Sequence, residues 1–126
     1  MPAVRIGIGG WTYEPWRGTF YPDGLPQKRE LEYVGQTLTA TEINATYYGR
    51  QSAKSWENWA KAVPDGFQFA VKGSRFIVMK SKLAEAGEGI ANFHAQGFAA
   101  LGDKLGPILW MFMARNRFDR DDMGAF

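Results

Sequence analysis

The sequence predicts an α/β domain built on a parallel β-sheet. Extended and helical patterns alternate along the 126 residues, in the order β-α-β-α-β-α-β. The expected strands begin about 30 to 40 residues apart, the length of a βα unit whose helical crossover makes consecutive strands parallel. With 45% hydrophobic residues, the chain can bury the core of one domain.

Four segments fit strands, because extended patterns of apolar and β-branched residues run between turn residues. The second of them has polar residues on one face of its two-residue period. The expected strands are VRIGIGGW (4–11), LTATEINATYY (38–48), FQFAVKGSRF (67–76) and PILWMFM (107–113).

Three apolar stripes with helical spacing separate these strands. They are formed by Leu31, Val34 and Leu38, by Trp56, Trp59, Ala60 and Val63, and by Ile90, Gly97, Phe98 and Leu101. A fourth helix is expected to begin after Asp119. This residue type favours the N-cap position, and the acidic Asp121 and Asp122 would follow in the first helical turn.

Two architectures have this element order, an open doubly wound sheet and a closed (β/α)₈ barrel. Eight units need about 250 residues, and this chain has half that length. The glycines Gly7, Gly9 and Gly10 do not complete a dinucleotide-binding motif, because Thr12 takes the third glycine position and no helix follows at once. We expect these glycines to allow close packing over the first strand instead.

The aromatic turn behind the first strand belongs to a wider set of motif residues. They are Gly10, Trp11, Tyr13, Trp16, Gly18, Phe20, Tyr21 and Pro22, then Glu42-Ile43-Asn44 with Thr46 and Tyr48, and then Trp59, Pro64, Gly66, Phe67, Phe69 and Lys72. With these residues the chain resembles the YecE-like proteins, also called domain of unknown function 72, from residue 4 to about 125. The resemblance implies a TIM-like (β/α) barrel, similar to sugar-phosphate isomerase and metal-dependent endonuclease barrels, for a protein of unsettled biochemical function.

Two departures from the family accompany this resemblance. Family members usually continue for about as many residues again. Residues 1–126 are therefore expected to form a single partial barrel domain, truncated at the C-terminus, with about four parallel strands and three to four helices. In addition, Met111 stands where the family commonly has a glutamine, which removes a polar group from the expected ligand face.

Glu42 and Lys72 form the candidate catalytic pair. Side chains alternate along a strand, so Glu42 shares a face with Asn44 and Thr46, and Lys72 takes the corresponding face of the next strand. A strand spacing of about 4.8 Å would bring the ammonium within reach of the carboxylate. Glu42 could then serve as an acid/base group, and Lys72 could clamp an anionic oxygen. The alternative is a buried ion pair that only holds the interior together.

The aromatic residues of the first loop divide into two groups. Trp11 and Tyr13, closest to the strand end, are candidate ligand-binding residues, because barrel ligands bind at this face and rings can stack on a sugar or a base. Trp16, Phe20 and Tyr21 are expected to form a small loop core, since a long loop needs apolar burial to be ordered.

Other candidate site residues are few. Arg75, after the third strand, is a candidate ligand for a phosphate, although a solvated loop cation is the commoner outcome. His94, on the third apolar stripe, is the single histidine, and there is no cysteine. The chain therefore lacks the histidines and cysteines that usually form metal sites, and no metal is expected. The sequence does not identify a cofactor.

The composition also bears on location. No apolar run approaches the roughly 18 residues of a membrane-spanning helix, and no signal sequence follows Met1. The absence of cysteine fits a reducing compartment, so a cytoplasmic protein without a membrane segment is expected.

Two main hypotheses of function follow from these residues. The first is an enzyme-like site for a small sugar, phosphate or nucleic-acid-derived ligand, with Glu42 as acid/base and Lys72 as anion clamp. The second is an inactive half-barrel fragment with no catalytic function. A nucleic-acid-binding module is a weaker third hypothesis: the net charge of +2 and the aromatic residues favour it, but the 15 basic and 13 acidic residues form no basic stripe.

A four-stranded parallel sheet also has two edges. Its first and fourth strands would leave backbone groups unpaired, and the segment 107–113 is apolar and uncharged. We therefore expect the chain to form a homodimer or an aggregate. In the dimer, two sheets could pair through these edges into a barrel-like eight-stranded sheet.

Overall fold

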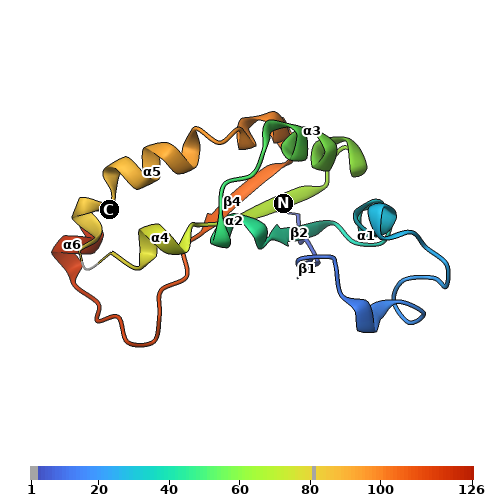
Figure 1. The fold of residues 1–126 in the computed structure, drawn as a ribbon, viewed down its shortest axis with the longest axis horizontal. Coiled ribbons are helices and arrows are strands. Elements are labelled where there is room, and N and C mark those ends of the chain that lie inside the picture. Colours follow the sequence, from blue (N-terminus) through green and yellow to red (C-terminus); the bar gives the residue numbers. More distant parts are fainter. Residues whose placement is uncertain (1–2, 81) are drawn as a thin grey trace.

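The computed structural model describes residues 3–80 and 82–126. Figure 1 shows an elongated ribbon with the sheet in the middle. Helices α4 and α6 lie at one end, and α1 with the long first loop lies at the other. The sheet therefore lies between these two ends of the molecule.

The sheet has four parallel strands in the order β1-β2-β3-β4. They are β1 (Gly7–Gly9), β2 (Ala40–Ile43), β3 (Gln68–Lys72) and β4 (Leu105–Leu109). Strands that are consecutive in sequence are neighbours in the sheet, as in a segment of a (β/α) barrel. The predicted α/β class with four parallel strands is confirmed.

The second and third strands are shorter than predicted, because helices begin where extended structure is expected. Asn44 has helical backbone angles and precedes α2 (Ala45–Tyr48). The Ser74 hydroxyl accepts a hydrogen bond from the Phe76 N–H and caps α4 (Arg75–Val78). Each of these strands therefore ends in a single helical turn.

The fourth strand is displaced from its predicted position. It begins two residues before the predicted start at residue 107 and ends at Leu109 instead of residue 113. Lys72, the last residue of β3, pairs with Leu109. Since β3 goes no further, the apolar residues beyond Leu109 have no strand to pair with.

The longer helices follow the predicted apolar stripes. They are α1 (Glu30–Thr37), α3 (Ala53–Ala62) and α5 (Gly87–His94). The shorter α6 (Arg120–Ala125) is the fourth helix expected after Asp119. The third stripe is divided, because Gly97 has a φ of 115° and the chain continues as the 3₁₀ helix Phe98–Lys104 (η4). Asp119 caps α6 as predicted, its carboxylate accepting from the N–H groups of residues 121 and 122. Among the described residues, no helix is long and apolar enough to cross a membrane.

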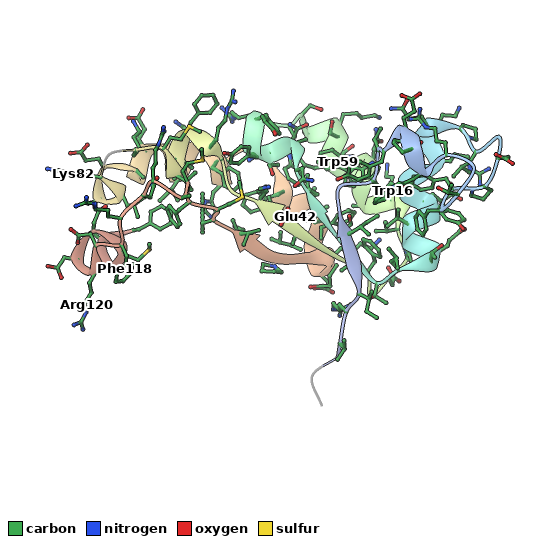
Figure 2. The ribbon with its side chains drawn as sticks, turned by 90° about the horizontal axis from the view of Figure 1, so that it is seen from below. Trp16, Glu42, Trp59, Lys82, Phe118 and Arg120 are labelled. Atoms are coloured by element: carbon green, nitrogen blue, oxygen red, sulfur yellow. The ribbon has the colours of Figure 1, made fainter. Side chains whose placement is uncertain are left out.

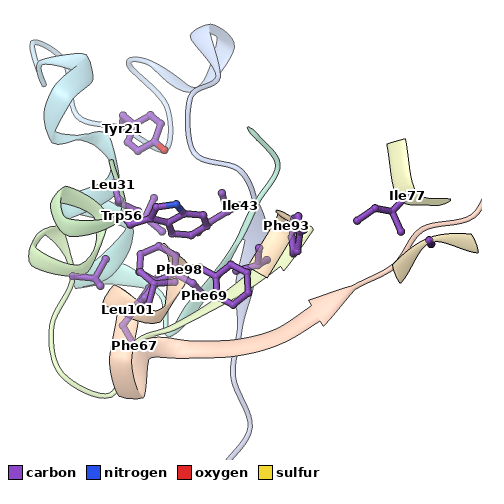
Figure 3. Close-up of a cluster of buried hydrophobic side chains, with 14 residues drawn as sticks. Tyr21, Leu31, Ile43, Trp56, Phe67, Phe69, Ile77, Phe93, Phe98 and Leu101 are labelled. Atoms are coloured by element: carbon purple, nitrogen blue, oxygen red, sulfur yellow. The ribbon is translucent and has the colours of Figure 1, made fainter. Parts of the chain in front are cut away.

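One face of the sheet is buried beneath the helices. Every second side chain of β2 and β3 is buried, as expected for strands with one covered face. The buried strand residues are Thr41, Ile43, Phe69 and Val71. Trp56 of α3 is fully buried and packs with Phe98 and Leu101 of η4 in the same core (Figure 3). Glu42 and Lys72 lie on the opposite, half-buried face.

The first loop is fixed by a small core of its own. Tyr21 is fully buried, and its hydroxyl donates to the carbonyl of Trp11. The rings of Trp16 and Phe20 pack against it and against each other. The ring of Tyr33, from α1, packs against the rings of Phe20 and Tyr21. The prediction that Trp16, Phe20 and Tyr21 pack a loop core is confirmed.

A buried carboxylate ties this loop core to α1. Glu30 has no exposed surface, and its Oε1 accepts a hydrogen bond from Arg17 Nε at 2.9 Å. Burial, and next the negative charge of Glu30, raises the pKa of Tyr21 to about 12. No pattern in the sequence predicts this pair, because Glu30 stands at the start of a helix, where an acidic residue is common.

Two glycines set the position of the first strand. A Cβ at Gly7 would collide with the carbonyl of Ala40 on β2, so β1 can lie this close only with glycine there. Gly10 follows β1 with a φ of 74°, a left-handed conformation that glycine adopts without strain. The expected close packing over this strand is thus confirmed at Gly7.

The buried Tyr21 predicts a loss of stability at alkaline pH. In the unfolded chain the phenol loses its proton near its ordinary pKa of 10.0, whereas in the folded chain it keeps it to about 12. The contribution of Tyr21 is therefore complete below pH 10 and is lost as the pH rises toward 12, by about 2 to 3 kcal/mol. Urea unfolding between pH 8 and about 11.5 would measure this loss.

Tyr21→Phe is the test variant for this titration. It should flatten the alkaline decline in the free energy of unfolding, even though it removes one hydrogen bond. Tyr48→Phe is the matched control, because Tyr48 is 62% exposed. If the Tyr21→Phe variant lost stability with pH as steeply as the parent chain, the buried phenol would not be the cause.

The unpaired edges of β1 and β4 predict self-association. No described strand pairs with the outer side of either strand. Near β1, Val4 and Ile6 are 87% and 66% exposed. We expect a homodimer or larger species above the chain mass of 14.1 kDa, measured by size-exclusion chromatography with light scattering at micromolar concentration.

The contribution of the edge can be tested with added charge. Val4→Lys combined with Ile6→Lys should shift the chain toward the monomer, because charged side chains disfavour edge pairing. Gln36→Lys combined with Asn58→Lys, at exposed helix positions, is the control with the same charge change. A parent chain that stays monomeric across this concentration range would refute the prediction.

Candidate functional site

Glu42 and Lys72 meet at the carboxyl ends of two adjacent parallel strands. The register pairs Glu42 of β2 with Ala70 of β3, two residues before Lys72. Glu42 Oε1 lies 3.9 Å from Lys72 Nζ, and the two side chains are 22% and 18% exposed. The predicted approach of these two groups is confirmed. At this distance the pair is loose, so a ligand oxygen could reach either group.

Two residues of α2 hold the lysine in place. The Thr46 hydroxyl donates to the carbonyl of Lys72 at 2.6 Å and ties α2 to the end of β3. The buried ring of Tyr47 lies beneath the ammonium, whose nitrogen is 5.3 Å from the ring centroid. A cation over an aromatic face is stabilised by the ring quadrupole. The lysine is thus positioned by the turn of helix that ends β2.

Thr46 lies elsewhere than predicted. The prediction places it on the strand face of Glu42, but β2 ends at Ile43 and Thr46 belongs to α2. It is only 1% exposed, and its hydroxyl also lies 3.1 Å from the carbonyl of Ile43. Because both contacts are made to backbone carbonyls, the hydroxyl stabilises the ends of β2 and β3.

Asn44 also leaves the strand face, yet stays near the site. It follows β2 directly and caps α2 through its backbone position. Its Nδ2 lies close to Gly9 and Gly10 at the end of β1. Its Oδ1 is buried and has no hydrogen-bond partner among the described residues. A buried acceptor without a partner is unfavourable, so Oδ1 of Asn44 is a polar group that the described residues leave unsatisfied.

Tyr13 and Trp11 take different positions in the first loop. The Tyr13 hydroxyl donates to the Gly9 carbonyl, and its ring, 36% exposed, packs on Trp16. The Trp11 ring meets Trp59 of α3 edge to face, with centroids 5.6 Å apart. Trp11 also lines a shallow hollow of about 520 Å³ with residues of α1 and α3. Tyr13 is therefore the nearer of the two to the strand ends, while Trp11 packs mainly toward the helices.

Arg75 lies at the start of α4 and is engaged by aromatic rings. Its guanidinium carbon is 5.4 Å from the ring centroid of Tyr48 and 5.0 Å from that of Phe76. Its Nε is buried without a hydrogen-bond partner among residues 3–80 and 82–126. The prediction extends the third strand through Arg75, whereas the structure places it on a helix beyond the strand end.

Other residues considered from the sequence lie outside this site. Met111 follows β4 and is 40% exposed. His94 is exposed rather than part of a buried stripe, and its Nδ1 lies 2.9 Å from the carbonyl of Ile90. Sequence reasoning missed Tyr47 as a site residue. In the sequence the segment Thr46-Tyr47-Tyr48 fits a strand, so only the helical turn of α2 reveals that the ring of Tyr47 faces the lysine.

Comparisons with known proteins agree on one family. A family model described as "Protein of unknown function DUF72" matches residues 5–126. A segment of 69 residues is 30% identical to the UPF0759 protein YunF of Bacillus subtilis (strain 168), covering 55% of this chain and 23% of that protein.

Solved structures resemble the fold. Two crystal structures of a DUF72 family protein from Enterococcus faecalis V583 match 96% of this chain at 20% identity, with TM-scores of 0.73 and 0.67. This chain covers 44% of each, so it spans less than half the length of these relatives.

The pairing of Glu42 with Lys72 is measurable as a coupling energy. Glu42→Ala leaves a poorly solvated ammonium without its partner and should destabilise the chain by about 1 to 2 kcal/mol. In a double-mutant cycle with Lys72→Ala, we expect a coupling of about 1 kcal/mol by urea unfolding. The exposed pair Arg29–Glu32 on the opposite end is the control and should show a smaller coupling. Equal coupling in both cycles would mean that Glu42 and Lys72 behave as a solvated surface pair.

Proposed function

This chain belongs to the DUF72 family, and we propose that the polar ends of its β2 and β3 form an enzyme-like ligand site. The ligand class is a small sugar, phosphate or nucleic-acid-derived molecule. Glu42 is the acid/base group, and Lys72 is the clamp for an anionic oxygen. The observation that carries this proposal is the 3.9 Å approach of the two charged groups, each about four-fifths buried, at strand carboxyl ends.

The position of the pair supports a ligand site. In parallel α/β sheets and barrels, ligands bind at the carboxyl ends of the strands. Both groups stand on short strands whose opposite face is packed into the core, so their positions are rigid. Rigid support of this kind is what a preorganised binding site requires.

The chemistry of the neighbouring groups supports an anionic and hydroxyl-bearing ligand. Lys72 can donate to an anionic oxygen, and a nearby carboxylate can accept a proton or a hydrogen bond from a hydroxyl. The unpartnered Oδ1 of Asn44 adds a second acceptor at the ends of β1 and β2. A sugar phosphate offers both kinds of group in one small molecule.

Binding can be tested by NMR titration of the ¹⁵N-labelled chain with ribose 5-phosphate. We expect saturable shifts at Gly10, Asn44 and Gly73, weaker shifts with inorganic phosphate, and none with ribose. Lys72→Met should weaken binding at least tenfold, because the anion loses its cation. Lys61→Met, at an exposed position of α3, is the control.

The role of Glu42 needs a separate readout. Glu42→Gln should retain binding of the phosphate, but abolish any exchange of ligand protons with D₂O that the parent chain catalyses. If no sugar or phosphate in a panel shifted the NMR signals of residues at the strand ends, the hypothesis of an inactive half-barrel fragment would replace this proposal. Binding that is unaffected by Lys72→Met would place the ligand elsewhere.

A further inference from the structure

The excess positive charge of this chain lies in the segments that follow three of its strands. Residues 44–52, 73–95 and 110–126 follow β2, β3 and β4 in turn. They contain seven Lys and Arg against five Asp and Glu, a formal net charge of +2. The remainder has eight basic and eight acidic residues, a net charge of zero. The fold thus brings together cations that are interspersed along the sequence.

A hollow of about 980 Å³ lies at this end, between the segment after α4 and the loop that follows β4. Asn116 of the loop donates from Nδ2 to the carbonyl of Val78, at 3.4 Å, and joins the two walls. The cations that line the hollow are Lys80, Lys82, Arg115 and Arg117. All four are exposed, and within the described part of the chain none makes an ion pair.

Carboxylates in the same hollow are mostly engaged with the backbone. Asp119 accepts from two N–H groups as the cap of α6. Asp122 accepts from the N–H groups of Leu83 and Ala84 at 2.8 and 3.0 Å, which lowers the pKa of its carboxyl. Asp121 is the third acid of the lining and is exposed. The lining therefore carries four cations against three carboxylates, a formal net charge of +1, and two of the carboxylates are held by backbone N–H groups rather than by the cations.

Exposed aromatic rings accompany these cations. Phe118 lines the hollow and is 78% exposed, and Phe76 and Tyr48 are 61% and 62% exposed. The guanidinium of Arg75 lies over the last two rings. Figure 2 shows Lys82, Phe118 and Arg120 together at one end of the molecule, with Glu42 nearer its middle. Phe76 lines a second hollow that shares Lys80 with the first. Large exposed rings are unfavourable in water, so rings beside these cations indicate a binding surface.

We propose that this cationic-aromatic face, made of the four hollow-lining cations with Arg75, Phe76 and Phe118, binds single-stranded nucleic acid. Single strands are held by a positively charged groove that follows the phosphates and by aromatic rings on which bases stack. Both parts are present here: the cations line the hollow together with Phe118, and Phe76 lines a second hollow that shares Lys80. The inference does not depend on the acid/base role of Glu42, because the face is formed by other residues.

An anionic membrane is the competing partner for a basic and aromatic surface. Peripheral membrane binding uses an amphipathic helix that lies flat in the interface. Here α4 spans only Arg75–Val78, and the cations line a hollow rather than one side of a long helix. This geometry favours a strand that enters the hollow over a flat lipid surface.

The direct test is fluorescence anisotropy with a labelled 12-nucleotide oligothymidylate at low salt. We expect micromolar binding that weakens steeply with salt, with a slope of log K against log salt near −3 if about four phosphates are neutralised. Arg115→Gln with Arg117→Gln should reduce affinity at least tenfold and make the slope shallower. Lys54→Gln with Lys61→Gln, at exposed positions of α3, is the control with the same charge change and should leave affinity unchanged.

Stacking and the competing partners are tested separately. Phe118→Ser should weaken oligothymidylate binding about tenfold without changing the salt slope, because it removes a stacking ring and no charge. Its melting temperature should match that of the parent chain, since Phe118 is exposed. Heparin, which has charges but no bases, should bind the parent chain and the Phe118→Ser variant alike.

Several results would overturn the proposal. One is oligothymidylate binding that is unaffected both by Phe118→Ser and by the two arginine substitutions. Another is affinity for duplex DNA equal to that for the single strand. A third is co-sedimentation with phosphatidylserine vesicles that depends on Arg115 and Arg117 while oligothymidylate fails to bind, which would assign the face to a lipid surface.

Discussion

The in-register parallel pairing of β2 with β3 is the constraint on which the rest of the structure depends. It places Ile43 beside Val71 on the covered face, where Trp56 and the helices bury them. Because side chains alternate, the same register places Glu42 and Lys72 on the open face at the strand ends. A slip of one residue would expose the core and bury the charged pair, so the core and the candidate site are specified together.

The first loop shows how a long connection becomes part of the scaffold. Its order comes from a fully buried tyrosine, a ring cluster and the Arg17–Glu30 ion pair, which link it to α1. A buried carboxylate is tolerated only when it is paired, and here the guanidinium supplies the partner. The loop consequently holds Tyr13 over the end of β1, close to Gly10 and Asn44. The packing of the first-loop core thus determines the position of Tyr13 beside the strand ends.

The residues at the ends of β2 and β3 differ in chemistry from those of the segments after α4 and β4. Glu42, Lys72 and Asn44 form a compact polar group at the ends of adjacent strands, suited to a small molecule. The loop after β4 and the segment after α4 carry four exposed cations and the exposed ring of Phe118 around a larger hollow. Because β2, β3 and β4 are parallel, the segments that follow them leave from the same end of these strands. Residues that are far apart in sequence are therefore brought to this end.

The sequence by itself determined the alternation of strands and helices, the covered faces of β2 and β3, and the approach of Glu42 to Lys72. These follow from the two-residue period and from βα spacing, which are local properties of the chain. Tertiary structure decided how α2 sits after β2, because Thr46 donates to the carbonyl of Lys72 at the end of β3. Together with the local cap at Ser74, this contact keeps Asn44, Thr46 and Arg75 off the strand faces. Tertiary structure also decided the burial of Glu30 and the gathering of the cations. Both depend on contacts between segments distant in sequence, which no local pattern records.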